Sequence, residues 1–158
     1  MAREKHFFGK RILITGISGT VGRCLTGELG KLGVSEIVGL DNNESALYLH
    51  AREKGADFRP ILGDIRDKET LESACRGMDI VFHLAALKHV PLCEVNPLEA
   101  VRTNILGVKN IINAAQKTDV EAVINTSTDK VVNPFNVMGT SKLMGEQLIR
   151  AANLCEGD

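Results

Sequence analysis

A strong net charge is absent from this sequence of 158 residues, because 19 lysines and arginines oppose 20 aspartates and glutamates. Such a balance argues against a broad electrostatic surface for nucleic acid or membranes. The roughly 20-residue apolar run that crosses a bilayer is also missing, and the first eight residues lack the apolar core of a signal peptide. We therefore expect a cytoplasmic protein with no nucleic-acid partner and no membrane segment in this chain.

Paired cysteines are absent too, since the four cysteines are far apart and none forms a C-x-x-C pair. This spacing favours neither a zinc site nor a disulfide framework, so no metal site is predicted. Free thiols, buried or half-buried in the fold, fit a reducing compartment. The four are Cys24, Cys75, Cys93 and Cys155.

Short apolar runs alternate with segments of helical periodicity along the whole chain. This alternation predicts a parallel sheet covered by helices on both faces, which right-handed crossovers make doubly wound. With no repeat or linker, we expect one α/β domain, a Rossmann fold over residues 1–158. The predicted strands are Arg11–Thr15, Glu36–Leu40, Asp57–Leu62, Ile80–Leu84 and Ala122–Thr126. The predicted helices are Thr20–Leu32, Glu44–Lys54, Lys68–Cys75, Leu98–Lys117 and Val137–Leu154, with a loop from Pro91 to Pro97.

The first strand leads into three glycines, Gly16-x-x-Gly19-x-x-Gly22, which open a helix. In a dinucleotide site the first glycine permits a tight turn, the second lets a diphosphate approach the backbone, and the third allows close helix packing. The helix N-terminus then offers free N–H groups and the positive end of its dipole. The pattern alone is weak in a chain with 15 glycines.

Asp41 strengthens this prediction, because it ends the second strand 19 residues after Gly22. An acidic side chain there can accept hydrogen bonds from both adenosine ribose hydroxyls, and it would repel a 2′-phosphate. NAD is therefore expected, with NADP less favoured. The alternative is a glycine-rich turn in which Asp41 only caps the next helix. Asp64 and Ile65 follow the third strand and could edge the adenine, although Asp64 could equally be a turn residue.

Four further motifs resemble the extended short-chain dehydrogenase/reductase family. They are Thr15-Gly16-x-x-Gly19-x-x-Gly22, Gly63-Asp64-x-Arg66-Asp67, His83-Leu84-Ala85-Ala86, and Thr126-Ser127-Thr128 with a lysine in the next helix. The strings Ala85–Pro91 and Ser127–Pro134 are similar to the CapD-like polysaccharide-biosynthesis group. Members of that group are nucleotide-sugar 4,6-dehydratases that act on UDP-N-acetylglucosamine.

The resemblance implies a site at the carboxyl edge of the sheet. Asp129 would be the acid and Lys130 the base of an elimination, Thr128 would bind the sugar 4-hydroxyl, and Lys142 would hold the nicotinamide ribose. The alternative is that both lysines are solvated surface residues. The expected cofactor contacts are Gly16, Ser18, Gly19, Thr20, Val21, Gly22, Asp41, Asn42, Asp64, Ile65, Leu84, Ala85, Ala86, Lys88, Asn104, Thr126 and Lys142.

Several of these assignments have simpler alternatives. Lys88 could contact substrate phosphate or sugar, or could be an ordinary loop lysine. The two alanines, Ala85 and Ala86, leave room for a dinucleotide but would also suit packing alone. His83 lies within an apolar strand and is expected to be a hydrogen-bonded core residue.

Two departures from the family pattern matter. The usual Tyr-x-x-x-Lys is Met138-Gly-Thr-Ser-Lys142 here, and methionine cannot accept a proton as a phenol would. The large, membrane-anchored relatives share this methionine. Relatives also continue into a C-terminal substrate lobe, which is absent from this chain, so it would be a fragment or a natural short protein.

Three functions remain open at this stage. The first is an NAD-dependent UDP-sugar 4,6-dehydratase, or its catalytic half; the second is a C4 epimerase, which needs no elimination pair. The third is a module that binds NAD without turnover, which we expect of the isolated chain. A homodimer is also expected, because relatives pair their two long helices. Packing on the sheet could explain the apolar row on the first helix, which consists of Val101, Ile105, Val108 and Ile112.

Overall fold

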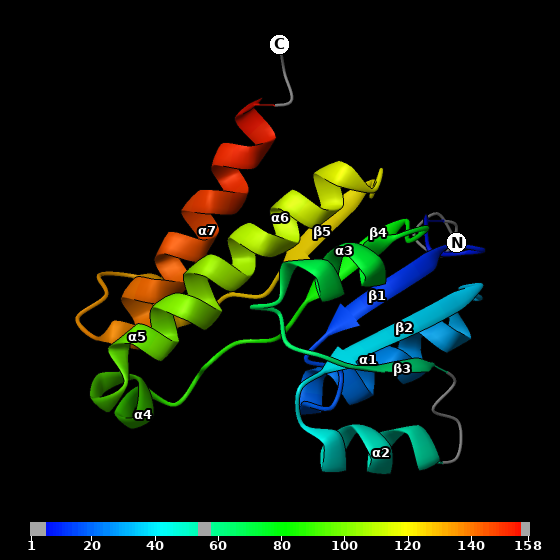
Figure 1. Cartoon of the computed structure of the whole chain (residues 1–158), viewed down its shortest axis with the longest axis horizontal. Helices are drawn as coiled ribbons and strands as arrows, with labels where there is room; N and C mark the ends of the chain where they lie inside the picture. Colours follow the sequence, from blue (N-terminus) through cyan, green and yellow to red (C-terminus); the bar gives the residue numbers. More distant parts are fainter. Residues whose placement is uncertain (1–5, 54–57, 156–158) are drawn as a thin grey trace.

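A computed structural model describes residues 6–53 and 58–155. Within them, five parallel strands form one sheet in the order β3-β2-β1-β4-β5 (Figure 1). The chain moves outward from β1 to β3 and then returns to the other side of β1, which confirms the predicted doubly wound topology. The strands are β1 (Arg11–Thr15), β2 (Glu36–Asp41), β3 (Arg59–Leu62), β4 (Ile80–His83) and β5 (Ala122–Asn125).

Helices cover both faces of this sheet because successive strand residues point to opposite sides. Leu13 of β1 packs in a core cluster with residues of α3 and α6, whereas its neighbours Ile12 and Ile14 pack with residues of α1 and α2. The helices are α1 (Thr20–Lys31), α2 (Glu44–Arg52), α3 (Lys68–Cys75), α4 (Val90–Val95), α5 (Pro97–Ala100), α6 (Gly107–Lys117) and α7 (Val137–Cys155). A π-helical segment η2 (Val101–Leu106) and a 3-10 turn η3 (Asp129–Val131) complete the described elements.

Local side chains set several helix ends. The Asn43 side chain accepts a hydrogen bond from the Ala46 N–H and so caps α2, and the Asp67 carboxylate accepts the N–H groups of Glu69 and Thr70 at the start of α3. Gly33 follows α1 with a φ of 74°, a left-handed conformation that glycine adopts without strain. The caps at Asn43 and Asp67 explain why the predicted starts of α2 and α3 were correct.

The stretch from Pro91 to Pro97 differs from its predicted loop conformation, because α4 occupies Val90–Val95. Proline interrupts a helix interior, but it fits the first turn, where its missing N–H has no intrahelical partner. Pro91 and Pro97 each stand at such a start, of α4 and α5 respectively. The predicted long helix is therefore a composite of α5, η2 and α6. Gly107 confirms its expected close packing, since an added Cβ would lie 2.7 Å from Ile65 Cδ1.

The cysteines follow the predicted pattern in part. Cys75 and Cys93 are buried, and burial raises the pKa of the Cys75 thiol to about 11. Cys24 is exposed, because it lies on the outward face of α1, so its predicted burial was wrong. The side chain of Cys155 and residue 57 of the predicted third strand lie outside the described residues. Among the described helices, none combines the length and apolarity that a bilayer crossing requires.

Two glycines of α1 provide a matched test of the packing at its start. An added Cβ at Gly22 would lie 2.3 Å from the Ile17 carbonyl oxygen, whereas at Gly27 it would meet no atom within 4 Å. We expect Gly22→Ala to lower the free energy of unfolding by about 1–3 kcal/mol through overpacking. Gly27→Ala should raise it by about 0.5–1 kcal/mol through helix propensity. Urea unfolding followed by circular dichroism measures both, and changes of the same sign would contradict this account.

Candidate functional site: a cleft at the carboxyl edge of the sheet

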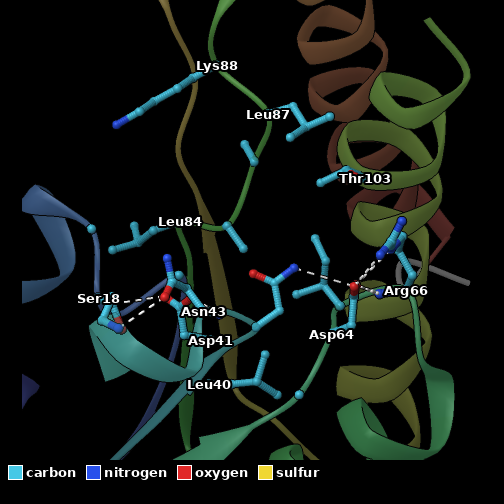
Figure 2. A pocket seen from close by; sticks show the side chains of 18 of the residues that line it. Ser18, Leu40, Asp41, Asn43, Asp64, Arg66, Leu84, Leu87, Lys88 and Thr103 are labelled. Carbon is cyan, nitrogen blue, oxygen red and sulfur yellow. Dashed lines mark hydrogen bonds and ion pairs between the residues drawn. The ribbon is translucent and has the colours of Figure 1, made fainter. Parts of the chain in front are cut away.

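A cleft of about 670 Å³ opens at the carboxyl ends of β1, β2 and β4 (Figure 2). This is the position where a doubly wound sheet reverses its strand order and where such folds bind ligands. Eleven of the predicted cofactor residues line it: Gly16, Ser18, Gly19, Asp41, Asn42, Asp64, Ile65, Leu84, Ala85, Ala86 and Lys88. The structure thus brings together residues that are up to 72 positions apart in the sequence.

The turn after β1 depends on Gly16. Its φ is 70°, and an added Cβ would lie 2.7 Å from the Ala85 backbone nitrogen. A side chain at this position would be strained and would also push the loop after β4 away from β1. Gly16 therefore serves the predicted tight turn and, in addition, the contact between the two sides of the cleft.

The N-terminus of α1 faces the cleft beside this turn. Gly19 is its N-cap residue and provides no side-chain cap, which leaves backbone N–H groups of the first turn available to an anion. In the described part of the chain, the buried Ser18 Oγ has no hydrogen-bond partner. Thr20 and Val21 begin the helix and are exposed, outside the cleft lining. The arrangement suits a phosphate group.

Asp41 connects this turn with the start of α2. Only 9% of the residue is exposed, and its Oδ2 accepts the Ser18 N–H at 3.0 Å while its Oδ1 accepts the Asn43 N–H at 3.0 Å. Asp41 therefore stabilises the loop and lines the cleft at the same time. A carboxylate has about four acceptor positions, so both oxygens can accept further hydrogen bonds from a ligand.

Asp64 lies at the other end of the cleft, where Arg66 points toward it (Figure 2). The side-chain amide of Asn42 lies 3.5 Å from Asp64 Oδ2. Arg66 Nη2 donates to Asp64 Oδ2 at 2.6 Å. Hydrogen bonds from Arg66 are the main reason that the pKa of Asp64 is lowered, and Asp64 in turn raises the pKa of Arg66. Asp64 is thus an ionised hydrogen-bond acceptor in the cleft wall.

Asn104 does not line the cleft, although it was predicted to contact the cofactor. It lies in η2 and is 2% exposed; its Oδ1 accepts the Leu87 N–H, and its Nδ2 donates to the Leu87 carbonyl and to Ser141 Oγ. These bonds use the side chain to hold the loop after β4 against α7. Ile65 is also mostly buried and provides apolar lining.

His83 is the hydrogen-bonded core residue that the sequence predicts. It is 2% exposed, and its Nδ1 lies 2.7 Å from Thr15 Oγ1 at the end of β1. Burial, assisted by the positive charge of Lys142, lowers the pKa of His83 to about 3. The imidazole is therefore neutral at physiological pH.

Lys142 is held near this histidine by the end of β5. Its Nζ donates to the Thr126 carbonyl at 2.6 Å, and Thr126 Oγ1 donates to the His83 carbonyl at 3.2 Å. Burial lowers the pKa of Lys142. Lys142 is therefore a partly buried, fixed lysine, which argues against its alternative as a solvated surface residue.

Thr128, Asp129 and Lys130 lie beyond β5, outside the cleft lining. Thr128 Oγ1 donates to Asp129 Oδ1 at 3.0 Å, and Lys130 Nζ donates to the same oxygen at 3.3 Å. These two neighbours lower the pKa of Asp129, whose side chain is 87% exposed. In this arrangement Asp129 is ionised, so an acid role requires that it first receives a proton.

Met138 occupies the position of the family tyrosine. It is 3% exposed and packs in a cluster with Cys93 and Ala100. The side chain is therefore a core residue between α7 and the α4–α5 region, and it offers no proton acceptor.

Sequence reasoning missed part of the cleft wall. Arg66 belonged to a recognised motif but received no role, and the residues from α4, α5 and η2 had no local signal. Only the folded chain brings these residues to the cleft. The lining residues that the sequence did not single out include Arg66, Leu92, Asn96, Glu99 and Thr103.

The strand order, the glycine turn and the acidic residue at the end of β2 define a Rossmann fold of the dinucleotide-binding kind. The chain belongs to the polysaccharide biosynthesis protein family, whose pattern matches residues 12–158. This agrees with the resemblance to CapD-like proteins noted from the sequence.

Three relatives illustrate the range of the family. A protein of Methanocaldococcus jannaschii, described as an uncharacterized membrane protein, is 48% identical and matches 94% of this chain and 45% of its own length. A UDP-N-acetylglucosamine 4,6-dehydratase (inverting) of Campylobacter jejuni is 40% identical, over 96% of this chain and 46% of the enzyme. A UDP-glucose 4-epimerase of Rickettsia akari is also 40% identical, over 94% of this chain and 46% of the enzyme.

Solved structures agree on the fold. Pen from Bacillus thuringiensis superposes with a TM-score of 0.91 at 37% identity, over 96% of this chain and 49% of Pen. A UDP-glucose 4-epimerase from Stenotrophomonas maltophila, with bound NAD and formylated UDP-arabinopyranose, gives a TM-score of 0.83 at 25% identity, over 94% of this chain and 50% of the enzyme. The chain spans about half the length of the relatives it matches.

The lowered pKa of His83 predicts a pH-dependent stability. Below about pH 6.5 the histidine is protonated in the unfolded chain, whereas in the folded protein it stays neutral down to about pH 3. The free energy of unfolding should therefore fall as the pH decreases through this window. One such group contributes a slope of up to about 1.4 kcal/mol per pH unit.

His83→Gln isolates this contribution, because His50, whose pKa burial also lowers, remains in both proteins. The variant should be less stable at pH 7 but should lose stability less steeply between pH 6.5 and 4.5 in urea titrations. Parallel pH profiles for the two proteins would show that His83 is not the titrating group.

Proposed function

We propose that residues 1–158 form a single cofactor-binding domain of an NAD-dependent enzyme that modifies UDP-sugars. The observation that carries this proposal is the joint placement of the glycine turn and Asp41 around one end of the cleft. The named activities of the Campylobacter and Rickettsia relatives support the substrate class. The NAD in the Stenotrophomonas structure supports the cofactor.

The residues of the cleft fit a dinucleotide from one end to the other. The first-turn N–H groups of α1 and the unpartnered Ser18 hydroxyl suit the pyrophosphate. Asp41 suits the adenosine ribose, and Asp64 and Ile65 suit the base. Lys142, which lies outside the lining of this cleft and is bonded to Thr126 just past β5, would hold the nicotinamide ribose. NAD, when bound there, supplies a hydride acceptor for sugar C4 and returns the hydride later in the cycle.

Asp41 favours NAD over NADP, because its carboxylate would repel a 2′-phosphate and would lose its ribose hydrogen bonds. Asp41→Asn should therefore lower the preference for NAD over NADP, measured as a ratio of dissociation constants by isothermal titration, by about tenfold or more, a change of about 1.4 kcal/mol. Glu44→Gln removes the same charge from an exposed position outside the cleft lining and is the matched control. An unchanged ratio in Asp41→Asn would contradict the proposal.

We propose 4,6-dehydration of UDP-N-acetylglucosamine as the reaction. Oxidation at C4 releases the proton of the 4-hydroxyl group, and the buried Met138 cannot accept it. Asp129, ionised and hydrogen-bonded to Thr128, is the proton acceptor that we propose instead. Once protonated, Asp129 can donate that proton to the leaving C6 hydroxyl group. Lys130 can remove the proton from C5 only as the neutral amine, so its ammonium must first release a proton to solvent. The same two residues are restored when the C5 proton is returned.

A UDP-sugar C4 epimerase is the second candidate, since the epimerase relative is as similar to this chain as the dehydratase relative. An epimerase oxidises the same carbon but releases no water. The adjacent Asp129–Lys130 pair favours the dehydratase, because the oxidation shared with an epimerase uses Asp129 alone, whereas an elimination also needs Lys130 as the base for C5. Binding of NAD without turnover is the third candidate for the chain by itself.

Product analysis of the full-length gene product distinguishes these candidates. With NAD and UDP-N-acetylglucosamine, we expect a 4-keto-6-deoxy sugar, identified by mass spectrometry as a loss of water. An isomer of unchanged mass would identify an epimerase, and NAD binding without any product would identify a binding module.

The oxidation step can be tested by itself with the 6-deoxy form of the substrate, which has no leaving hydroxyl group. Reduced NAD, which absorbs at 340 nm, should form with the unchanged protein and with Lys130→Gln. In Asp129→Asn the rate of its formation should fall by at least about 100-fold, as for a missing general base. Oxidation by Asp129→Asn at the normal rate would remove Asp129 from this step.

A homodimer is also part of the proposal. The structure shows that Val108, from the predicted apolar row, is buried within the chain, whereas Val101 and Met144 are partly exposed on η2 and α7. The exposed residues support a helix-to-helix contact with a second copy, and the buried one is explained by intramolecular packing.

A further inference from the structure

One carboxylate in the cleft wall has nearly all of its acceptor positions occupied. Asp64 Oδ2 accepts Arg66 Nε at 2.9 Å and Nη2 at 2.6 Å, and the amide of Asn42 lies 3.5 Å from the same oxygen. Within residues 6–53 and 58–155, Asp64 Oδ1 accepts only the Arg66 backbone N–H, at 2.9 Å. Because each carboxylate oxygen has two lone-pair positions, one position on Oδ1 is left for a ligand.

Arg66 is fixed from a second side by an element distant in the sequence. Its remaining terminal nitrogen, Nη1, donates to Glu99 Oε2 at 2.8 Å, and Glu99 belongs to α5. Glu99 Oε1 also accepts Arg102 Nη1 at 2.6 Å. Arg66 thus connects the loop after β3 with α5, and all three residues Asp64, Arg66 and Glu99 line the cleft.

The shape of the guanidinium group makes this connection specific to arginine. Its planar fork can hold one carboxylate with two parallel N–H groups and a second carboxylate with the third nitrogen. The ammonium of lysine is a point charge on a flexible stem and cannot fix the orientation of Asp64 in this way. Arg66 therefore fixes the orientation of the Asp64 carboxylate, with Oδ2 turned toward the guanidinium group.

An ionised carboxylate can accept a hydrogen bond but cannot donate one. Arg66 lowers the pKa of Asp64, so the carboxylate is in this form throughout the neutral range. A ligand group beside Oδ1 is then favoured if it carries an N–H donor and is disfavoured if it presents a carbonyl oxygen.

We propose that Arg66 is a positioning residue for base selection: it orients Asp64 so that the cleft accepts a purine with an exocyclic amino group and rejects one with an oxo group. The inference rests on the proposed dinucleotide function. It adds to that function a determinant, the Arg66–Glu99 connection, that lies outside the glycine motif.

The test compares binding of NAD with binding of nicotinamide hypoxanthine dinucleotide, in which an oxo group replaces the adenine amino group. Isothermal titration on this chain gives both dissociation constants and their ratio. For the unchanged protein we expect NAD to bind about tenfold more tightly or better, as for the loss of one hydrogen bond to a charged group. Asp64→Asn, which can donate, should bring the ratio close to one.

The variants of Arg66 address the positioning role. Arg66→Gln should reduce the ratio to less than about threefold, and Arg66→Lys should not restore it, because a lysine keeps the charge but not the fork. Arg102→Gln is the matched control, since it removes a guanidinium that contacts Glu99 but not Asp64. Thermal melting of each variant verifies that it is folded.

Ionic strength provides a readout that a purely structural role would not change. Exposed ion pairs weaken with salt, so the ratio should fall between 0.05 and about 0.5 M salt in the unchanged protein but not in Arg66→Gln. Equal weakening of both dinucleotides in a folded Arg66→Gln, with the ratio intact, would overturn the inference while leaving the proposed function in place. Failure of the unchanged protein to bind either dinucleotide would overturn the proposed function, and the inference with it.

Discussion

The close approach of Gly16 to the backbone of Ala85 is the constraint on which the cleft depends. It joins the end of β1 to the loop after β4, at the point where the chain has reversed direction across the sheet. The Thr15–His83 hydrogen bond lies directly beneath this contact and links the same two strands. Because an added Cβ at Gly16 would lie 2.7 Å from the Ala85 nitrogen, only glycine allows this spacing between the two sides of the cleft.

Charged groups are arranged around this frame in two different ways. Along the cleft, Asp41 and Asp64 are each held by hydrogen bonds from their own surroundings, so they present oriented acceptors to a ligand. Near the end of β5, Lys142 of α7 is partly buried and fixed, whereas Asp129 and Lys130 are exposed on a short turn. Asp129 therefore lacks the burial that raises the pKa of a carboxylate.

Several features that depend on interactions between near neighbours in the sequence were predicted correctly, and others that depend on distant contacts were not. The starts of α2 and α3 were correct because Asn43 and Asp67 cap helices through neighbours three residues away or nearer. The helix at Val90–Val95 was missed because proline was interpreted as a break, although at a helix start it costs nothing. Asn104 was expected to contact the cofactor, but its three hydrogen bonds go to Leu87 and Ser141, in a loop and a helix that the sequence does not bring together.

The sequence by itself determined the fold class, the glycine turn, the acidic residue at the end of β2 and the family. These features depend on local pattern and on backbone conformations that few residues can adopt. Only the tertiary structure decided that Asp41, expected to bind a ribose, also supports the turn after β1, that Arg66 connects two distant segments, and that Met138 is part of the core. Such roles depend on which side chains meet, and packing brings them together from positions whose separation along the chain carries no signal. The turn at Gly16 depends on both, because its backbone conformation is set locally whereas its closest neighbour, Ala85, is distant in the sequence.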